Sequence, residues 1–269
     1  MDSKLSNHPI GLFDSGVGGF SVLKEIINKL PYEDTIYFAD TGRRRYGTKP
    51  EEEVLQYVFE IIQFLISKKV KAIVIACNTA TAVSLEQVKN KFTIPIMGVI
   101  EPGARMAVHC SKKKRIGLIG TEITIRSKVH QQIIESLCPT VKFFPLPTPL
   151  LGEFVEQSLN RPEEIQTTIN DYLSYFKKKR IDTLILGCTH YPFLRSYISQ
   201  YLGDQICLVD PAEATVIDLE QHLNRHNLLN KSKKVPEYTF FTSGDLSRLK
   251  TNIKQLLGLN IFNAKVHSF

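Results

Sequence analysis

The feature that most constrains the fold is a regular alternation of short apolar segments with longer amphipathic ones. Segments that are apolar throughout suit strands covered on both faces of a sheet. We expect such strands at residues 10–13, 35–39, 72–76, 95–100, 115–119, 141–144, 183–186, 207–209 and 238–242. The sequence between them predicts helices that include residues 19–29, 51–67, 82–91, 125–137, 162–177 and 193–202. This alternation favours βαβ units, mainly parallel sheets flanked by helices, and an α/β fold.

Part of the sequence repeats itself. Residues 68–79 contain a basic helix end, an apolar strand and then a cysteine, and residues 178–189 show the same order. Residues 10–15 match residues 116–121 at a similar offset. Chance likeness between apolar strands is the alternative, but the chemistry at the matching positions agrees as well as the hydropathy. We therefore expect two pseudo-symmetric domains, one formed by residues 1–98 plus 209–269 and the other by residues 99–208.

The net charge of +7 and the pI near 9.1 would suit an acidic partner. The basic residues, however, gather in short runs at residues 68–71, 112–115 and 177–180, just before predicted strands. Cations at a helix C-terminus are favoured by the helix dipole, so we interpret these runs as solvated helix ends and do not expect nucleic acid as a partner. No apolar run approaches the ~18 residues of a bilayer span, and residues 1–9 carry no secretory signal. We expect a cytoplasmic protein with no membrane partner.

The five cysteines are odd in number, widely spaced and without a CxxC pair. A disulfide framework, a structural zinc site or a thiol-redox motif is therefore not expected. Cys110, Cys138 and Cys207 are interpreted as small buried hydrophobes. Cys77 and Cys188 differ, because each follows a predicted strand and precedes a small polar residue. That edge of an open α/β sheet is where ligands bind.

Thiols at such strand ends lie near helix N-termini, whose free N–H groups favour thiolate over thiol. Two acid/base groups on opposite sides of one ligand suit inversion at a carbon that bears an acidic proton. One thiolate removes the proton while the other cysteine, as a thiol, delivers a proton to the opposite face. The glycine-rich turn at residues 16–19 lacks the GxGxxG spacing of a dinucleotide loop. We interpret it as a tight turn that presents Asp14 and Ser15 to a small ligand.

The motifs together are similar to the signatures of the glutamate racemase family, within the aspartate/glutamate racemase superfamily. The main matches, in family order, are residues 13–19, 76–80 and 187–192, and supporting matches lie at residues 39–41, 46–47, 98–103 and 119–121. The resemblance implies a cofactor-independent isomerase, with no PLP, metal or nucleotide, that interconverts L- and D-glutamate. It also implies two α/β domains with the active site at their interface, and a supply of D-glutamate for peptidoglycan, cell wall biogenesis and cell shape.

The resemblance carries roles onto matching positions. Cys77 and Cys188 become the two acid/base residues, with Asp14, His190 and Glu156 as their assistants. The substrate-contacting positions are Asp14, Ser15, Tyr46, Gly47, Asn78, Thr79, Thr121, Thr189 and His190. Hydroxyls, amides and backbone N–H donors suit the substrate carboxylates, and Asp14 suits the ammonium group.

Three positions depart from the family pattern. Arg45 replaces a proline in the stretch that here reads Gly42-Arg43-Arg44-Arg45, which should make the loop more flexible. Ile123 stands where a second glycine is common, and Thr148 replaces a common cysteine. None of these changes touches Cys77 or Cys188.

Two alternatives stay open at this point. An aspartate racemase or a broader amino-acid epimerase would share the two-cysteine site, although aspartate-specific relatives generally carry glutamate at the position of His190. A weakly active scaffold with a binding role, of the kind that some family members have toward gyrase, is the second. We expect glutamate as the partner molecule and a monomer or homodimer as the assembly.

Overall fold

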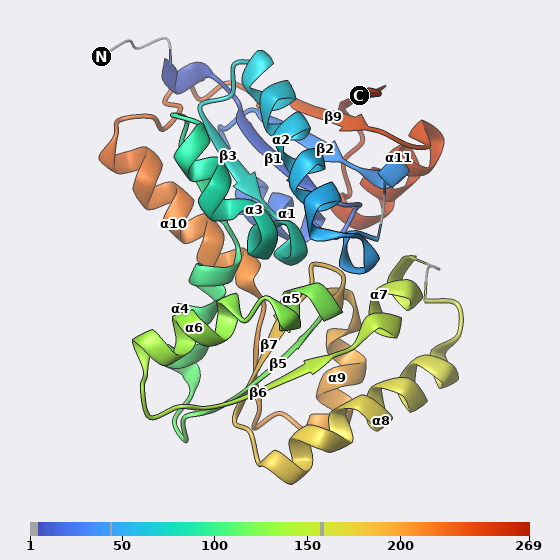
Figure 1. The fold of residues 1–269 in the computed structure, drawn as a ribbon. Helices are drawn as coiled ribbons and strands as arrows, with labels where there is room; N and C mark the ends of the chain where they lie inside the picture. The colour runs from blue at the N-terminus through green and yellow to red at the C-terminus, as the bar shows by residue number, and fades with distance from the viewer. Residues whose placement is uncertain (1–4, 44, 157–158) are drawn as a thin grey trace. The chain divides into compact units, whose positions relative to one another are not determined.

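The computed structural model describes residues 5–43, 45–156 and 159–269, and the chain divides into two compact units (Figure 1). Unit 1 comprises Met1–Val99 and Thr215–Phe269, and unit 2 comprises Ile100–Ala214. The chain passes from one unit to the other after Val99 and again inside helix α10 (Pro211–Arg225). The sequence predicted this second boundary between residues 208 and 209, before α10 begins.

Unit 1 contains a parallel six-stranded sheet in the order β10-β9-β2-β1-β3-β4. Its strands are β1 (Ile10–Asp14), β2 (Thr35–Ala39), β3 (Ala72–Ile75), β4 (Ile96–Gly98), β9 (Tyr238–Thr242) and β10 (Asn263–Val266). Strands β1, β2 and β3 are almost entirely buried, as their apolar sequences predict. Edge strand β10 was not predicted, because it is short, partly polar and mostly exposed.

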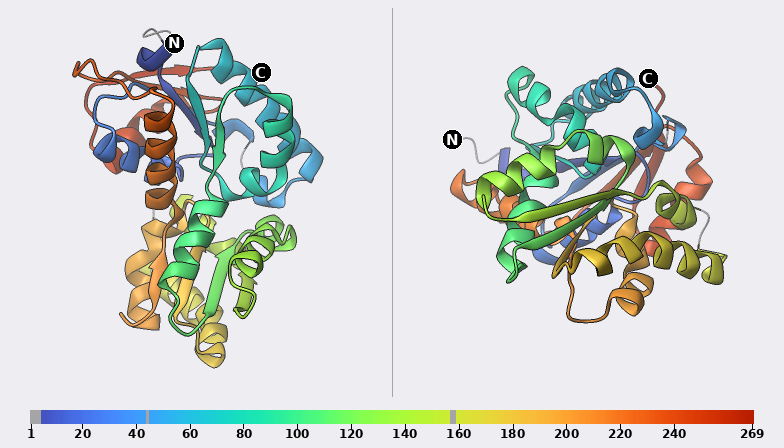
Figure 2. Two further views of the ribbon diagram at one scale, coloured as in Figure 1. Left: turned by 90° about the vertical axis from the view of Figure 1, so that its left-hand side faces the viewer. Right: turned by 60° about the horizontal axis from the view of Figure 1, so that its bottom comes forward.

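The helices of unit 1 cover both faces of this sheet (Figure 2, left). They are α1 (Phe20–Lys29), α2 (Glu51–Ser67), α3 (Asn78–Lys91), most of α10 and α11 (Leu246–Asn252), with single turns η1 (Leu5–Asn7), η2 (Thr41–Arg43), η3 (Tyr46–Thr48) and η5 (Ile253–Leu257). Helices α2 and α3 pack against Phe13 and Phe38 on one face. On the other face, Phe20 of α1 makes edge contacts with Tyr37 and Phe240.

Unit 2 contains a parallel four-stranded sheet in the order β6-β5-β7-β8. Its strands are β5 (Arg115–Gly120), β6 (Lys142–Pro147), β7 (Thr183–Gly187) and β8 (Cys207–Val209). Its helices are α4 (Ile100–Cys110), α5 (Glu122–Arg126), α6 (Val129–Leu137), α7 (Pro149–Glu156), α8 (Pro162–Lys179), η4 (Tyr191–Leu194) and α9 (Arg195–Leu202). One core lies under α4 and α6, and another lies under α7, α8 and α9 on the opposite face.

The two sheets share a strand order. The order β2-β1-β3-β4 in unit 1 corresponds to β6-β5-β7-β8 in unit 2, strand for strand in chain order. In both units a cysteine follows the third strand of this set, Cys77 after β3 and Cys188 after β7. The predicted fold class, two related α/β halves with parallel sheets flanked by helices, is therefore confirmed.

Element bounds differ from the sequence expectation at several places, and three of these differences have a clear local cause. The helix expected at residues 125–137 is divided into α5 and α6, because Lys128 adopts a left-handed φ of 57° between them. The strand expected at residues 95–100 ends at Gly98, since Ile100 already begins α4. Helix α3 begins earlier than expected, because Cys77 caps it. Among the described residues, no helix is both long and apolar enough to cross a bilayer.

A buried ion pair fastens remote segments of unit 1 together. Lys71, just before β3, pairs with Glu33, and both side chains are almost fully buried. Lys71 Nζ also donates to the carbonyls of Ser6, at 2.6 Å, and Leu228, at 2.8 Å. The second carboxylate oxygen of Glu33 accepts from the backbone N–H of Asn230 at 2.8 Å. The pair thus holds the N-terminal turn and the segment after α10 against the sheet.

Removing one member of this pair should destabilise the protein strongly, because the other charge is left buried without its partner. We expect Lys71→Met to lower the free energy of unfolding by about 3–5 kcal/mol, and Lys71→Met/Glu33→Leu to recover part of that loss. Urea unfolding measures both values, with Lys265→Met on exposed β10 as the control. A cost for Lys71→Met no larger than the control would contradict the role of the pair.

His130 on α6 should make the stability depend on pH. Its side chain is buried, and neither ring nitrogen has a hydrogen-bond partner among the described residues. Burial lowers its pKa to about 3, so the unfolded chain binds a proton below pH ~6.5 that the folded chain refuses. Stability is lost as pH falls, by about 2 kcal/mol at pH 5.

The variant His130→Leu should lack this loss of stability at low pH. We expect its free energy of unfolding to fall less between pH 7 and pH 5 than that of the wild type, by about 2 kcal/mol. Urea titrations at both pH values test this, with His109→Leu at an exposed position of α4 as the control. Equal pH dependence in His130→Leu and wild type would show that His130 is not the group responsible.

Candidate active site

Cys77 stands at the carboxyl end of the unit 1 sheet. It follows β3 and caps α3, where its Sγ accepts a hydrogen bond from the Ala80 N–H at 3.5 Å. The thiol donates to Ser15 Oγ at 3.8 Å. Parallel pairing of β1 with β3 sets Phe13 opposite Ile75, so the residues that follow the two strands meet at one edge. The structure therefore brings together the predicted residues Asp14, Ser15 and Cys77.

The glycine-rich turn after β1 allows close packing around Asp14. The Asp14 side chain is fully buried, and its Oδ1 accepts from the Gly16 N–H at 2.8 Å. A Cβ atom on Gly19 would lie 2.7 Å from Tyr37 Oη and 2.8 Å from Asp14 Cβ, so a larger residue would force these groups apart. Tyr37 in turn donates to the Gly16 carbonyl at 3.0 Å. The turn fixes the carboxylate in place.

The electrostatics at Cys77 differ from the sequence expectation. A helix N-terminus was expected to favour the thiolate. In the structure, burial and then the negative charge of Asp14 raise the pKa of the Cys77 thiol to about 12. The hydrogen bonds from Ala80 and Ser15 act in the opposite direction but are outweighed. Cys77 is therefore held as a thiol at neutral pH, beside a carboxylate.

The predicted residue Tyr46 belongs to a network that sequence reasoning missed. Its hydroxyl donates to Asp40, the residue that follows β2. The Asp40 carboxylate also accepts from Arg43 Nε at 3.0 Å and from Ser243 Oγ at 2.5 Å. Ser243 follows β9, so the same rule that placed the other candidates, polar residues after parallel strands, could have found it. Asp40 follows β2 and its partner Ser243 follows β9, so residues at the carboxyl ends of two further strands hold Tyr46 in place.

Arg45 precedes this tyrosine with a left-handed φ of 65°. Proline is restricted to φ near −65°, so a proline at this position would require a different backbone. The departure from the family pattern is thus accompanied by a distinct local conformation, with Thr48 donating its backbone N–H and its hydroxyl to the Arg45 carbonyl. Arg44 lies outside the described residues.

The remaining predicted residues of unit 1 lie on the same elements. Asn78 and Thr79 form the first turn of α3 and are buried, and Gly47 is half-buried in η3. Asn78 Oδ1 is buried without a hydrogen-bond partner among the residues that the structure describes. Because an unpaired buried acceptor is costly, this oxygen is available to accept a hydrogen bond from a ligand.

Unit 2 places a different set of groups beside its cysteine. Cys188 follows β7, and its Sγ lies 3.5 Å from Nδ1 of His190. The other ring nitrogen of His190 lies 3.9 Å from Oε1 of Glu156, near the end of α7. All three side chains are partly or largely buried. The structure thus brings Cys188, His190 and Glu156 into one chain of contacts, while Gln157, next to Glu156, lies outside the described residues.

Thr121 and Thr189 flank the same sheet edge. Gly120 of β5 is opposite Gly187 of β7, so Thr121 and Cys188 follow neighbouring strands. Thr121 caps α5, accepting from the Thr124 N–H at 3.2 Å, and Thr189 is buried directly after the cysteine.

A buried hydrogen-bonded pair, Thr148 and Tyr191, lies at this edge of the sheet. The Thr148 hydroxyl donates to Tyr191 Oη at 3.0 Å, and Tyr191 donates to the Thr148 carbonyl at 2.9 Å. Thr148, which departs from the family's usual cysteine, therefore fills a hydrogen-bonding role. Ile123, the other departure in unit 2, is a buried residue of α5.

At the carboxyl edge of its sheet, each unit thus places ionisable side chains beside one thiol, a carboxylate in unit 1 and an imidazole and a carboxylate in unit 2. These groups can accept, hold and return protons. In the described part of the chain, no three histidine, cysteine or acidic side chains form a group that could hold a metal ion.

Comparison with known proteins gives a consistent result. The family model described as Asp/Glu/Hydantoin racemase matches residues 35–219. A glutamate racemase of Geobacter metallireducens is 44% identical over 234 residues, which are 87% of this chain and 87% of the relative. The structure of glutamate racemase isoform RacE1 from Bacillus anthracis has a TM-score of 0.92 at 38% identity and 98% coverage of both chains. That of the Francisella tularensis enzyme in complex with D-glutamate has a TM-score of 0.91 at 33% identity, again covering 98% of each.

The raised pKa of Cys77 predicts its reactivity. A free cysteine is half thiolate near pH 8.5, but in the folded protein we expect the alkylation rate of Cys77 to keep rising above pH 10, because burial and Asp14 disfavour the thiolate. Asp14→Asn should move the midpoint toward lower pH. Iodoacetamide labelling followed by peptide mass spectrometry measures it, and the urea-unfolded protein is the control. A folded-state midpoint equal to the unfolded one would contradict this assignment.

Proposed function

The chain belongs to the glutamate racemase family and is an amino-acid racemase, and from this premise we propose that it interconverts L- and D-glutamate with two cysteines and no cofactor. The observation that supports the proposal most directly is the repeated position of the thiols. Cys77 and Cys188 follow equivalent strands of two sheets that share one strand order. Equivalent acid/base groups are what a reaction that runs in both directions requires.

In the proposed reaction, the thiolate of one cysteine removes the α-proton of bound glutamate, and the thiol of the other gives its proton to the opposite face of the carbanion. In the reverse direction the two cysteines exchange roles. After the first transfer both cysteines are thiols and the substrate carbanion carries the negative charge. The second transfer quenches the carbanion and leaves the donating cysteine as the thiolate, so protons and charge balance.

The assistants differ because their surroundings differ. Asp14 acts on the buried Cys77 thiol through its charge, and we assign it the role of accepting that proton when Cys77 must become the base. His190 contacts the Cys188 sulfur through one ring nitrogen. Glu156 lies beside the other ring nitrogen, and we assign it the role of orienting the imidazole. The ammonium of the substrate would reduce the negative charge around Asp14 and so ease ionisation of Cys77.

Substrate binding is assigned to the polar groups at the two sheet edges. The unpaired Oδ1 of Asn78 suits the substrate ammonium, which donates hydrogen bonds. Hydroxyls and backbone N–H groups suit the two carboxylates, and the residues assigned to them are Ser15, Tyr46, Gly47, Thr79, Thr121 and Thr189. The working species in this proposal is a monomer or homodimer that acts on free glutamate in the cytoplasm and supplies D-glutamate for peptidoglycan.

Solvent exchange tests the reaction directly. Metal-stripped protein incubated with either enantiomer of glutamate in D2O should convert it to the racemate, and the newly formed enantiomer should carry deuterium at the α-carbon, because the proton delivered comes from a thiol that has exchanged with solvent. Chiral chromatography and proton NMR follow the two events. If glutamate shows neither inversion nor α-proton exchange, the proposed reaction is wrong; faster exchange with aspartate would favour the aspartate alternative.

Single substitutions test the two-cysteine assignment. Cys77→Ala and Cys188→Ala should each lower racemisation at least about a hundredfold, because each removes one of the two proton-transfer groups. Cys138→Ala is the matched control, since Cys138 is also a half-buried free cysteine and contacts Thr140 instead. Wild-type rates in either of the first two variants would show that the pair is not the acid/base couple.

A further inference from the structure

Unit 2 contains a cavity far from Cys188, at the opposite edge of its sheet. The cavity has a volume of about 770 Å³ and lies at the amino ends of β7 and β8, whereas Cys188 follows the carboxyl end of β7. Two cysteines that the proposed reaction does not use line it, Cys110 at the end of α4 and Cys207 at the start of β8. The sequence analysis interpreted both as inert core residues.

The two thiols are neighbours. Cys110 and Cys207 line the same cavity, and both are half-buried residues at the margin of the same apolar core, under α4. Burial and the adjacent Cys110 thiol raise the pKa of Cys207 to about 11. Two neighbouring thiols that line one open cavity can be joined by oxidation if a reagent reaches one of them.

The charge around the cavity selects the kind of reagent. Its lining includes four basic side chains, those of Lys112, Lys113, Lys177 and Arg180. The acidic residue that also lines it, Asp182, is engaged by the Ser111 hydroxyl at 2.6 Å and by the Lys113 backbone N–H. The lining therefore favours a small anion, with apolar walls from Phe176, Ile181, Leu202 and Ile206 for an uncharged part.

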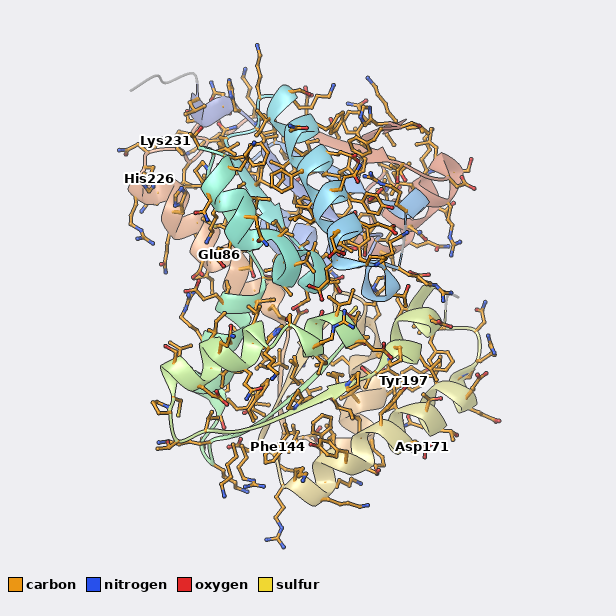
Figure 3. All side chains as sticks on the ribbon, in the orientation of Figure 1. Glu86, Phe144, Asp171, Tyr197, His226 and Lys231 are labelled. Atoms are coloured by element: carbon orange, nitrogen blue, oxygen red, sulfur yellow. The ribbon has the colours of Figure 1, made fainter. Side chains whose placement is uncertain are left out.

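Two other basic side chains of this region contact an aromatic ring. Arg115 and Lys179 lie over the ring of Phe144 on β6, at 5.0 and 5.7 Å from its centre, and Phe144 is labelled in Figure 3. Lys177 both lines the cavity and contacts the Tyr201 ring, at 3.8 Å. Lys112 and Lys113 are exposed, so they are the side chains to change when the charge is tested.

We propose that Cys110 and Cys207 form a redox-active dithiol site that reacts with anionic low-molecular-weight disulfides and closes to an intramolecular disulfide. The Cys110 thiolate attacks one sulfur of the small disulfide, which forms a mixed disulfide and releases one small thiolate. The Cys207 sulfur then attacks the Cys110 sulfur, which breaks the mixed bond and releases the second small thiolate. The protein loses two electrons and two protons, and the small disulfide is reduced to two thiols.

The location gives this bond a structural consequence. Helix α4 is the first element of unit 2 after the chain leaves unit 1, and β8 leads into α10, along which the chain returns. Near the other end of α4, a Cβ atom on Gly103 would lie 2.9 Å from Pro211 Cγ, so these two connecting segments already pack closely there. A disulfide between Cys110 and Cys207 would join the same two segments covalently.

Two aromatic disulfides test the site in the full-length protein, the dianionic dithiobis(nitrobenzoate) and the neutral dithiodipyridine. We expect the pair to release two aryl thiolates and to keep none, and peptide mass spectrometry should recover the Cys110 and Cys207 peptides linked to each other. In Cys207→Ser, one aryl thiol should stay bound to Cys110. Cys138, half-buried and beside Thr140, is the internal control and should keep its aryl group as a mixed disulfide.

Charge selection is tested with Lys112→Gln/Lys113→Gln. At low salt this variant should react at the pair about threefold or more slowly with the dianionic reagent, and at an unchanged rate with the neutral one. The Cys138 rate corrects for intrinsic reagent differences. Aryl groups retained on both Cys110 and Cys207, or unreactive thiols there while Cys138 reacts, would overturn the dithiol site. Equal loss of rate with both reagents would overturn its anion preference. Racemase activity, measured separately, bears on neither outcome.

Discussion

Parallel pairing of neighbouring strands is the constraint on which the rest of the structure depends. Because β1 and β3 run side by side in one direction, Ser15 and Cys77 are delivered to the same edge from distant parts of the sequence. The pairing of β5 with β7 does the same for Thr121 and Cys188. A sheet of this kind is stable only when both faces are covered, which is why helices alternate with strands throughout the chain.

The two halves share a strand order but differ in electrostatics. In unit 1 burial and the carboxylate of Asp14 raise the pKa of the Cys77 thiol, whereas in unit 2 the sulfur of Cys188 contacts an imidazole that lies beside a second carboxylate. Two sheets with the same strand order therefore supply the thiol twice, and each thiol has different neighbouring side chains. Under the proposed mechanism, this division would let one fold bring similar groups to a reaction that needs an acid and a base at once.

The amino edge of the unit 2 sheet, opposite the edge that carries Cys188, brings basic side chains together with two further cysteines. Amino ends of parallel strands receive the basic ends of the preceding helices, so Lys177 and Arg180 gather there beside the residues that end α4. The runs of basic residues lie at or just after helix ends, as expected, but Lys71 is buried in its ion pair with Glu33 and is not solvated. Residues of the runs at 112–115 and 177–180 also border a cavity. Because Cys110 and Cys207 line the same cavity, these basic side chains surround two thiols and can attract an anionic reagent to them.

The sequence by itself determined the fold class, the bounds of β2 and α2, and the placement of both candidate cysteines after strands, because apolar periodicity and strand ends are local patterns. It did not determine β10, which is polar, or the break at Lys128, which depends on one backbone angle. Only the tertiary structure decided the raised pKa of Cys77, the contact of Asp40 with Ser243 and the placement of Cys110 and Cys207 in one cavity. Burial and contacts between residues far apart in the chain arise from packing, and no local pattern records them.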